Sequence, residues 1–137
     1  GVQLEVGSVA TDFEHRSFAQ ELALCQRYYY RATSDAVGQR FGSGNQMTSS
    51  AANILIPLPV TMRIKPTALE TSGTASDYSV ARASTYDICN AVPTFDIATP
   101  NIANILTNQT ISTVSVGQCV QLRANSTNCI LGFSAEL

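Results

Sequence analysis

The chain of 137 residues has only 13% charged residues and a formal net charge of −2. Its eight lysine and arginine residues are scattered, so the sequence lacks the basic patch that nucleic acid or an anionic membrane would require. No run approaches the roughly 18 apolar residues of a membrane-spanning helix. We therefore expect no nucleic-acid binding and no membrane insertion, and the length favours a single domain over residues 1–137.

Residues 1–16 are predicted to be a strand followed by a linker. Val2, Leu4 and Val6 alternate with polar residues, which is typical of a half-buried strand. Because the chain begins inside this pattern, we expect it to be a piece of a longer protein.

A short helix is predicted over residues 17–28. Ser17 and Gln20 have the spacing of a capping box at a helix start. Four side chains then follow at spacings of 4, 3 and 4, which is one face of a helix: Phe18, Leu22, Cys25 and Tyr29. We expect this stripe to form an apolar contact that buries Cys25.

The tyrosines at 28–30 mark the predicted change from helix to strand, because consecutive aromatic residues favour extended chain. Neighbours in a strand point to opposite faces, so at least one of these tyrosines should be buried and one exposed. Residues 38–53 are rich in Gly, Ser and Asn, which predicts an irregular loop.

The clearest strand is predicted over residues 54–64, where every even position is apolar. Pro57 and Pro59 lie on the odd positions and remove two backbone donors from the same side. We therefore expect an edge strand, or a strand bulged at the prolines.

Further strands are predicted downstream. Residues 93–100 read as a short segment bounded by prolines, and residues 101–110 fit either a short helical turn or a loop that leads into a strand. Residues 78–88 alternate, and four of their side chains share one parity: Tyr78, Val80, Tyr86 and Ile88.

The two last segments are predicted to form a hairpin around "NSTN" at residues 125–128. Cys119 and Cys129 would lie on opposite faces of it, which disfavours a disulfide between them. The facing pairs would be apolar, among them Leu122 with Leu131 and Val120 with Phe133.

These elements amount to about seven to nine short strands and one helix, which is typical of an antiparallel sandwich. We predict an all-β fold, an antiparallel β-sandwich of jelly-roll type over residues 29–137, with one short N-terminal helix.

The sequence offers little for catalysis, and we predict no catalytic residue, metal or cofactor. Cys25 could act as a nucleophile only with His15 as its base, so we favour core packing for this thiol. The four cysteines fit either free buried thiols or at least one disulfide, and their spacing matches no zinc pattern. The acids that could pair in a glycosidase are interpreted as surface residues: Asp12 with Glu14, Asp77 with Asp87, and Asp96.

The best ligand-binding candidates are Asp77, Tyr78 and Arg82. A flat tyrosine ring can stack on a sugar while its hydroxyl forms hydrogen bonds, and Tyr78 follows a polar, turn-rich stretch. If it does, Tyr78→Ala should weaken binding without lowering thermal stability. The alternative is a tyrosine at a strand start, half-packed on its neighbours.

Three stretches of the sequence resemble a module found at the C-terminus of tail-fibre and tailspike proteins of tailed bacteriophages. They are "ELALCQRYY" at 21–29, "PVTMRIKP" at 59–66 and "GFSAEL" at 132–137. The resemblance implies a β-rich homotrimer at the end of a virion fibre, joined to the remainder of the fibre and assembled in the host cytoplasm. It also implies that the strand and linker over residues 1–16 come from a preceding domain. It implies recognition of a host-surface polysaccharide or outer-membrane receptor, and it carries over no catalytic residue.

We therefore expect a non-enzymatic receptor-binding domain in the virion. A purely structural module for trimerisation or virion decoration is the first alternative, and a polysaccharide depolymerase is the second. Receptor specificity is expected in the loops of residues 67–115, which match no motif of the module.

Overall fold

The computed structural model describes residues 6, 7, 9, 15–83, 85–109 and 115–135. The predicted all-β fold with one short helix is confirmed, while most of the predicted strand within residues 1–16 lies outside the described residues. The elements are, in chain order, α1 (Phe18–Gln26), β1 (Tyr29–Thr33), β2 (Arg40–Gln46), β3 (Ala51–Pro57), β4 (Ala68–Thr71), the 3-10 helix η1 (Ala75–Asp77), β5 (Tyr78–Arg82), β6 (Thr85–Ala98), β7 (Ile102–Gln109), β8 (Cys119–Ala124) and β9 (Ile130–Ser134).

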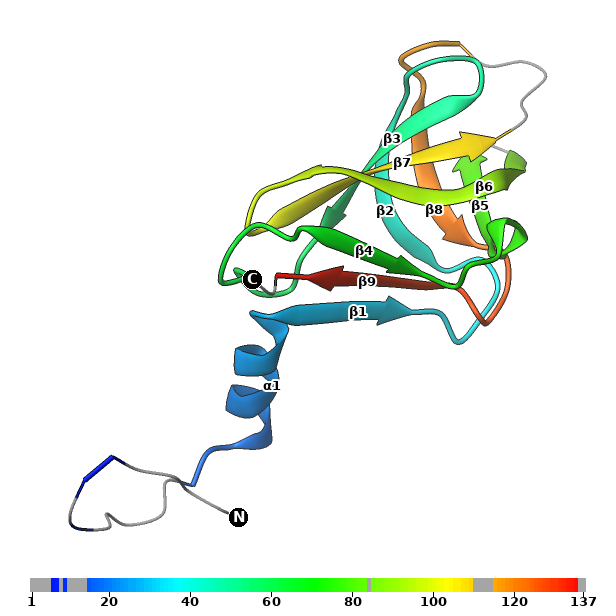
Figure 1. Ribbon diagram of the computed structural model, residues 1–137. Coiled ribbons are helices and arrows are strands. Elements are labelled where there is room, and N and C mark those ends of the chain that lie inside the picture. Colours follow the sequence, from blue (N-terminus) through cyan, green and yellow to red (C-terminus); the bar gives the residue numbers. More distant parts are fainter. Residues whose placement is uncertain (1–5, 8, 10–14, 84, 110–114, 136–137) are drawn as a thin grey trace.

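The main sheet closes into a six-stranded barrel in the order β2-β3-β7-β6-β5-β8, and every pairing in it is antiparallel. A three-stranded sheet, β1-β9-β4, lies beside it (Figure 1). The predicted sandwich of open sheets is thus replaced by a closed barrel with a smaller sheet against it. Closure leaves the six barrel strands without free edges.

One apolar core joins the barrel to the small sheet. Ile54, Ile105 and Leu122 from the barrel are 0% exposed, and so are Leu131 and Phe133 from β9. Because both sheets bury side chains in the same core, the small sheet is held by packing as well as by hydrogen bonds.

The predicted C-terminal hairpin is wrong. β8 pairs with β2 and β5, whereas β9 pairs with β1 and β4. Leu122 and Leu131 are both fully buried, but they reach the core from different sheets. An apolar alternation shows that two strands face one core and cannot show whether they pair with each other.

The predicted loop over residues 38–53 contains β2 and the start of β3, which pair with each other. A Cβ on Gly44 would overlap the carbonyl oxygen of Asn53 and lie 2.9 Å from the Cα of Ile54. Here glycine permits close approach of two backbones and does not mark a loop.

The strand predicted over residues 54–64 ends early, at Pro57, and it is not an edge strand because β3 pairs with both β2 and β7. Pro57 takes the last strand position and Pro59 lies beyond it. The predicted burial of even positions is nevertheless confirmed at Ile54, Ile56 and Met62. The undecided segment over residues 101–110 contains strand β7.

The helix begins as predicted and then departs from expectation. Ser17 Oγ accepts a hydrogen bond from the Gln20 backbone and Gln20 Oε1 accepts one from the Ser17 backbone, so the capping box is confirmed. The change to strand at the tyrosines is also confirmed, with Tyr29 exposed and Tyr30 packed against the core.

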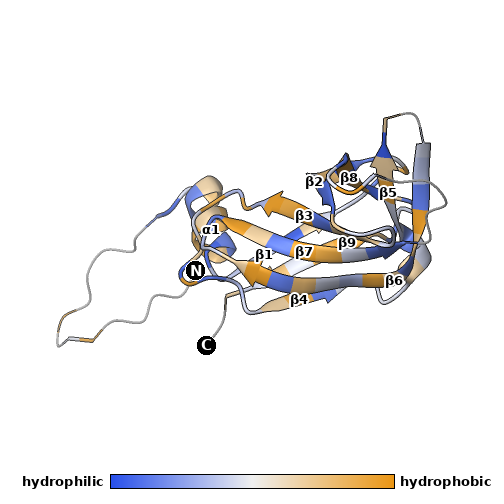
Figure 2. Ribbon diagram, turned by 90° about the horizontal axis from the view of Figure 1, so that it is seen from above, coloured by the Kyte–Doolittle hydropathy of each residue, from blue (hydrophilic) through white to orange (hydrophobic). Residues whose placement is uncertain are grey.

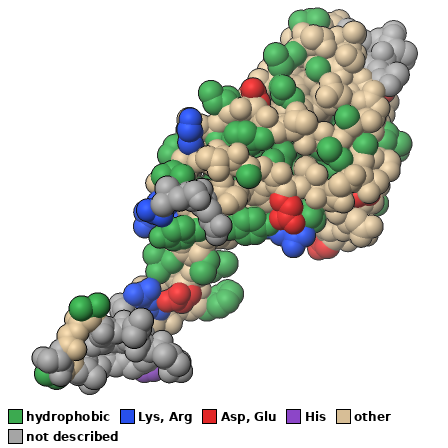
Figure 3. Space-filling view, viewed as in Figure 1, with side chains coloured by type: hydrophobic (Ala, Val, Ile, Leu, Met, Phe, Trp, Pro, Cys, Tyr) green, Lys and Arg blue, Asp and Glu red, His purple; other side chains and the backbone are tan. Residues whose placement is uncertain are grey.

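None of the nine residues of α1 is buried, so the expected burial of Cys25 is wrong. The helix projects from one end of the body (Figures 1 and 2). Hydrophobic side chains gather along it on the viewed face (Figure 3). We call Phe18, Leu22 and Cys25 the helix stripe, and all three are exposed.

Candidate functional site

Tyr78 lies in the core and not on a ligand surface. Its side chain is 0% exposed, and its hydroxyl accepts a hydrogen bond from the Ser72 backbone at 2.8 Å and donates one to the carbonyl of Ile130 at 2.6 Å. The expectation of an exposed stacking ring is therefore wrong. Alternation showed which residues share a face but not which face is buried.

Asp77 is also nearly buried, at 8% exposed. Its carboxylate accepts a hydrogen bond from Ser126 Oγ at 2.6 Å, and its backbone carbonyl accepts one from the Asn125 backbone at 2.7 Å. Asp77 thus anchors the connection between β8 and β9. These contacts give it a structural role next to Tyr78.

Arg82, the third predicted ligand residue, forms an ion pair with Asp87 on the neighbouring strand β6. The side chain is only 8% exposed. It nevertheless lines a cleft at the barrel surface, which the fully buried Tyr78 does not line. Of the three predicted residues, Arg82 alone lines this cleft.

We call this the barrel cleft, and its volume is about 460 Å³. β5 contributes Ala81 between two strands with longer side chains, and Ala81 pairs with Gln121 of β8. The small Ala81 side chain therefore forms the bottom of the cleft, and longer polar side chains form its sides. The lining residues are Arg40, Ala81, Arg82, Ala83, Gln118, Cys119 and Gln121.

Arg40 is fixed in place at the wall of the barrel cleft. Its Nε donates a hydrogen bond to Gln121 Oε1 at 3.0 Å, and its Nη1 donates one to the carbonyl of Gly38 at 3.2 Å. A guanidinium carries five N–H donors, so several remain for a ligand. The cleft can therefore donate hydrogen bonds from a preorganised group to hydroxyl or acidic oxygens.

Tyr86 is the exposed aromatic residue beside this cleft, and the search for ligand residues missed it. It pairs with Ala81 across β5 and β6 and is 50% exposed, with the guanidinium of Arg123 stacked over its ring at 4.0 Å. The short turn between β5 and β6 reverses the faces, so Val80 points inward while Tyr86 points outward. A turn predicted near residue 83 would have placed Tyr86 on the outward face.

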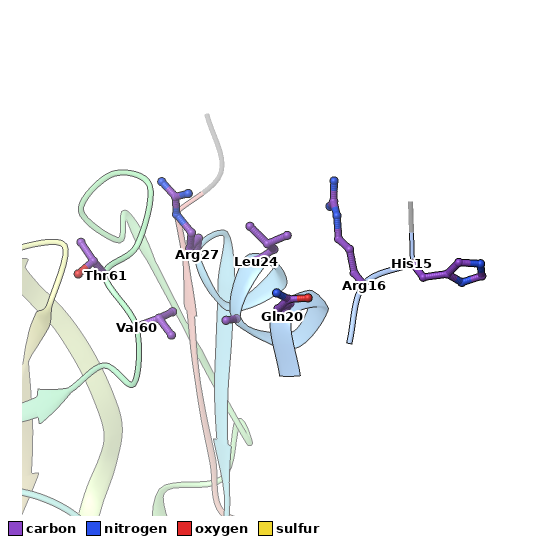
Figure 4. Close-up of a pocket in the computed structure, with 8 residues that line it drawn as sticks. His15, Arg16, Gln20, Leu24, Arg27, Val60 and Thr61 are labelled. Carbon is purple, nitrogen blue, oxygen red and sulfur yellow. The ribbon is translucent and has the colours of Figure 1, made fainter. Parts of the chain in front are cut away.

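A second, larger hollow lies between α1 and the segment after β3, with a volume of about 870 Å³ (Figure 4). We call it the helix groove. Its lining residues are His15, Arg16, Gln20, Ala23, Leu24, Arg27, Val60 and Thr61. In the close-up, His15 points away from Val60 and Thr61, so the two ends of the groove do not converge on one point.

The helix groove and the helix stripe occupy opposite faces of α1. At 3.6 residues per turn, the helix residues that line the groove centre roughly 180° around the helix from the centre of the stripe. These groove residues are Gln20, Ala23, Leu24 and Arg27. Cys25 therefore faces away from the groove that His15 lines.

All four cysteines are free, which settles the alternative left open by the sequence, and the disfavoured bridge between Cys119 and Cys129 is absent. Burial raises the pKa of Cys89 and of Cys129 to about 12, so both thiols are poor nucleophiles. Cys25 and Cys119 are exposed.

Within the described ranges, the acidic, histidine and cysteine side chains form no group of three or more that could hold a metal ion. Of the acids considered for a glycosidase, Asp87 is paired with Arg82 and Asp96 accepts a hydrogen bond from Asn104 Nδ2 at 2.8 Å. Asp12 and Glu14 lie outside the described residues.

Comparisons with family models, curated proteins and solved structures found no match to this chain. Over the described part of the chain, no helix has both the length and the apolar character needed to cross a membrane.

Proposed function

We propose that the chain is the C-terminal receptor-binding domain of a bacteriophage tail fibre or tailspike, and that the barrel cleft binds a host-surface polysaccharide without cleaving it. The observation that carries this proposal is the chemistry of the cleft. Arg40, Gln118 and Gln121 offer guanidinium and amide groups above an alanine floor, and the exposed Tyr86 adjoins them. Such groups suit the many hydroxyls of a sugar.

The helix stripe supports the proposed homotrimer. Phe18, Leu22 and Cys25 follow the 4 and 3 spacing of a coiled-coil seam, and they are exposed in the single chain. A helix of nine residues is marginal alone, so contact with the same stripe of other copies would stabilise it. Three copies would also strengthen weak polysaccharide binding by avidity.

In this proposal the N-terminal side of α1 continues into the remainder of the fibre, and the domain belongs to the virion after assembly in the host cytoplasm. The residues most like the fibre module, 21–29, would then serve assembly. The recognition surface would lie on the barrel. An outer-membrane receptor in place of a polysaccharide is a further possible partner of this surface.

A purely structural trimerisation or decoration module is the second candidate function, and the exposed helix stripe favours it as much as it favours the first. The two candidates differ in whether the barrel cleft binds anything. A depolymerase, the remaining alternative, needs two free carboxyl groups beside the bound sugar. It predicts the release of reducing ends from a bound polysaccharide.

The test is an array of immobilised bacterial surface polysaccharides probed with the purified chain. We expect binding to a subset of them, lost in the double variant Gln118→Ala with Gln121→Ala. Asn108→Ala on β7 is the matched control, because it removes an amide from a strand that does not line the cleft. Absence of binding to the whole array would favour the structural module, and release of reducing ends would favour the depolymerase.

A further inference from the structure

Two arginines lie opposite each other on the outer face of the barrel. Arg40 on β2 and Arg123 on β8 are cross-strand partners. Like charges placed directly opposite in an antiparallel pair destabilise it, so this arrangement calls for an explanation.

Among the described residues, no carboxylate forms an ion pair with Arg40 or Arg123. The ion pairs Arg31–Glu70 and Arg82–Asp87 account for other arginines. The hydrogen bonds from Arg40 go to the uncharged acceptors Gln121 and Gly38. Arg123 stacks on Tyr86, and its Nη1 atom is buried with no hydrogen-bond partner among the described residues.

Both guanidinium groups converge on Gly38. The Gly38 carbonyl accepts the hydrogen bond from Arg40, and a Cβ on Gly38 would lie 3.6 Å from Nε of Arg123. Gly38 lies in the turn between β1 and β2 and has a φ of +99°, which glycine adopts readily. Two positive charges with no carboxylate partner in the described part of the chain are therefore held together beside the barrel cleft, which Arg40 also lines.

We propose that the arginine pair and the barrel cleft bind an acidic saccharide, with Arg40 contacting its carboxylate, sulfate or phosphate group. This inference rests on the proposed function and narrows its ligand class. An acidic group beside the pair would neutralise charge that no described carboxylate compensates, and the planar fork of Arg40 can bind two of its oxygens at once. Gln118 and Gln121 would then contact neighbouring hydroxyls.

General attraction of a polyanion does not account for such binding, because the whole chain carries a net charge of −2. Any preference for acidic sugars must come from local groups. The exposed Arg31 on β1 offers a matched comparison, since it is paired with Glu70 and lies outside the barrel cleft.

The first experiment compares chemically paired ligands. The wild-type chain is probed on bacterial surface polysaccharides, with each acidic one also supplied after carboxyl reduction or after removal of sulfate or phosphate esters. We expect every bound polysaccharide to be acidic and to lose at least tenfold in affinity when neutralised, and the treatment that abolishes binding identifies the acidic group. Undiminished binding to a neutral form would overturn this inference and leave the proposed function standing, whereas no binding to the whole panel would overturn both.

The second experiment assigns the site with variants whose folding is checked by circular dichroism. On the acidic polysaccharide bound best, Arg40→Gln should lose at least tenfold in affinity. Arg40→Lys, which keeps the charge but not the fork, should lose severalfold, and Arg31→Gln should match the wild type. Equal losses in Arg40→Gln and Arg31→Gln, or wild-type affinity in Arg40→Gln, would overturn the assignment.

Discussion

The hydroxyl of Tyr78 donates a hydrogen bond of 2.6 Å to the carbonyl of Ile130. Tyr78 begins barrel strand β5, and Ile130 begins strand β9 of the small sheet. The same hydroxyl accepts a hydrogen bond from the Ser72 backbone, just after β4. One buried side chain thus joins the barrel to two strands of the small sheet.

Tyr78→Phe should therefore lower stability and leave ligand affinity unchanged. It removes one donor and one acceptor while keeping the ring, which should cost about 1–3 kcal/mol of unfolding free energy because buried backbone groups lose their partner. Urea titration of the purified variant measures the loss. Tyr86→Phe is the control, since its ring is half exposed, and it should cost much less; equal losses in the two variants would contradict this role for Tyr78.

The two buried thiols should make stability decline in alkaline solution. Burial raises the pKa of Cys89 and Cys129 from 9.0 to about 12. Between pH 9 and 12 the unfolded chain therefore binds fewer protons than the folded chain, so the unfolding free energy falls as pH rises. Each thiol contributes at most about 1.4 kcal/mol per pH unit in this window, and nothing below it.

Urea midpoints at pH 7, 8, 9 and 10 measure this decline. The double variant Cys89→Ala with Cys129→Ala will be less stable at every pH because it leaves space in the core. Its midpoint should nevertheless fall less steeply above pH 9 than that of the wild type. Identical slopes would show that other groups control the alkaline decline.

Gly44→Ala should prevent folding or destabilise the chain severely. The added Cβ would overlap the carbonyl oxygen of Asn53, which belongs to the paired strand and cannot move without breaking the barrel ladder. Gly73→Ala is a suitable comparison, because its Cβ would meet no atom within 4 Å and only the positive φ of 80° opposes it. We expect Gly73→Ala to lower the unfolding free energy by about 1–2 kcal/mol. Gly44→Ala should give insoluble protein, or soluble protein with no cooperative unfolding transition. A well-folded Gly44→Ala would contradict the close approach of β2 to β3 at this glycine.

The sequence predicted well those features that depend on neighbouring residues. The capping box at Ser17, the change to strand near Tyr29 and the buried alternation through Ile54 and Ile56 depend on local spacing, and all were confirmed. Strand partners depend on the whole fold. The β8–β9 hairpin was wrong because two strands that face one core have the same alternation whether they pair or belong to different sheets.

The candidate site was predicted only in part, for the same reason. Arg82 lines the barrel cleft, and its role in binding stays a prediction. Tyr78 was placed on the exposed side of its strand, because alternation shows which residues share a face but not which face is buried. Arg40 and Arg123 are 83 positions apart in the chain and become neighbours only through the β2–β8 pairing. No local pattern could place them together.

Leu22→Glu should abolish the proposed trimer without unfolding the barrel. It places a charge in the middle of the helix stripe, where it would be buried between copies, while the single chain exposes this position at 43%. Light scattering after size-exclusion chromatography should give three chains for the wild type and one for the variant. Glu21→Gln, on the same helix but outside the stripe, should remain trimeric, and a monomeric wild type would contradict the assembly.

A polysaccharide that occupies the barrel cleft should protect Cys119 from alkylation, and this protection can be measured directly. Cys119 lines the cleft and is exposed, whereas Cys25 lies on the helix stripe, where trimer assembly would cover it, so its rate reports whether the assembly stays intact. Their rates of reaction with iodoacetamide can be followed together by peptide mass spectrometry, with and without a polysaccharide that the array has identified as a ligand. We expect saturating polysaccharide to slow modification of Cys119 severalfold and to leave the rate at Cys25 unchanged. An unchanged rate at Cys119 while the polysaccharide is bound would contradict binding in the barrel cleft.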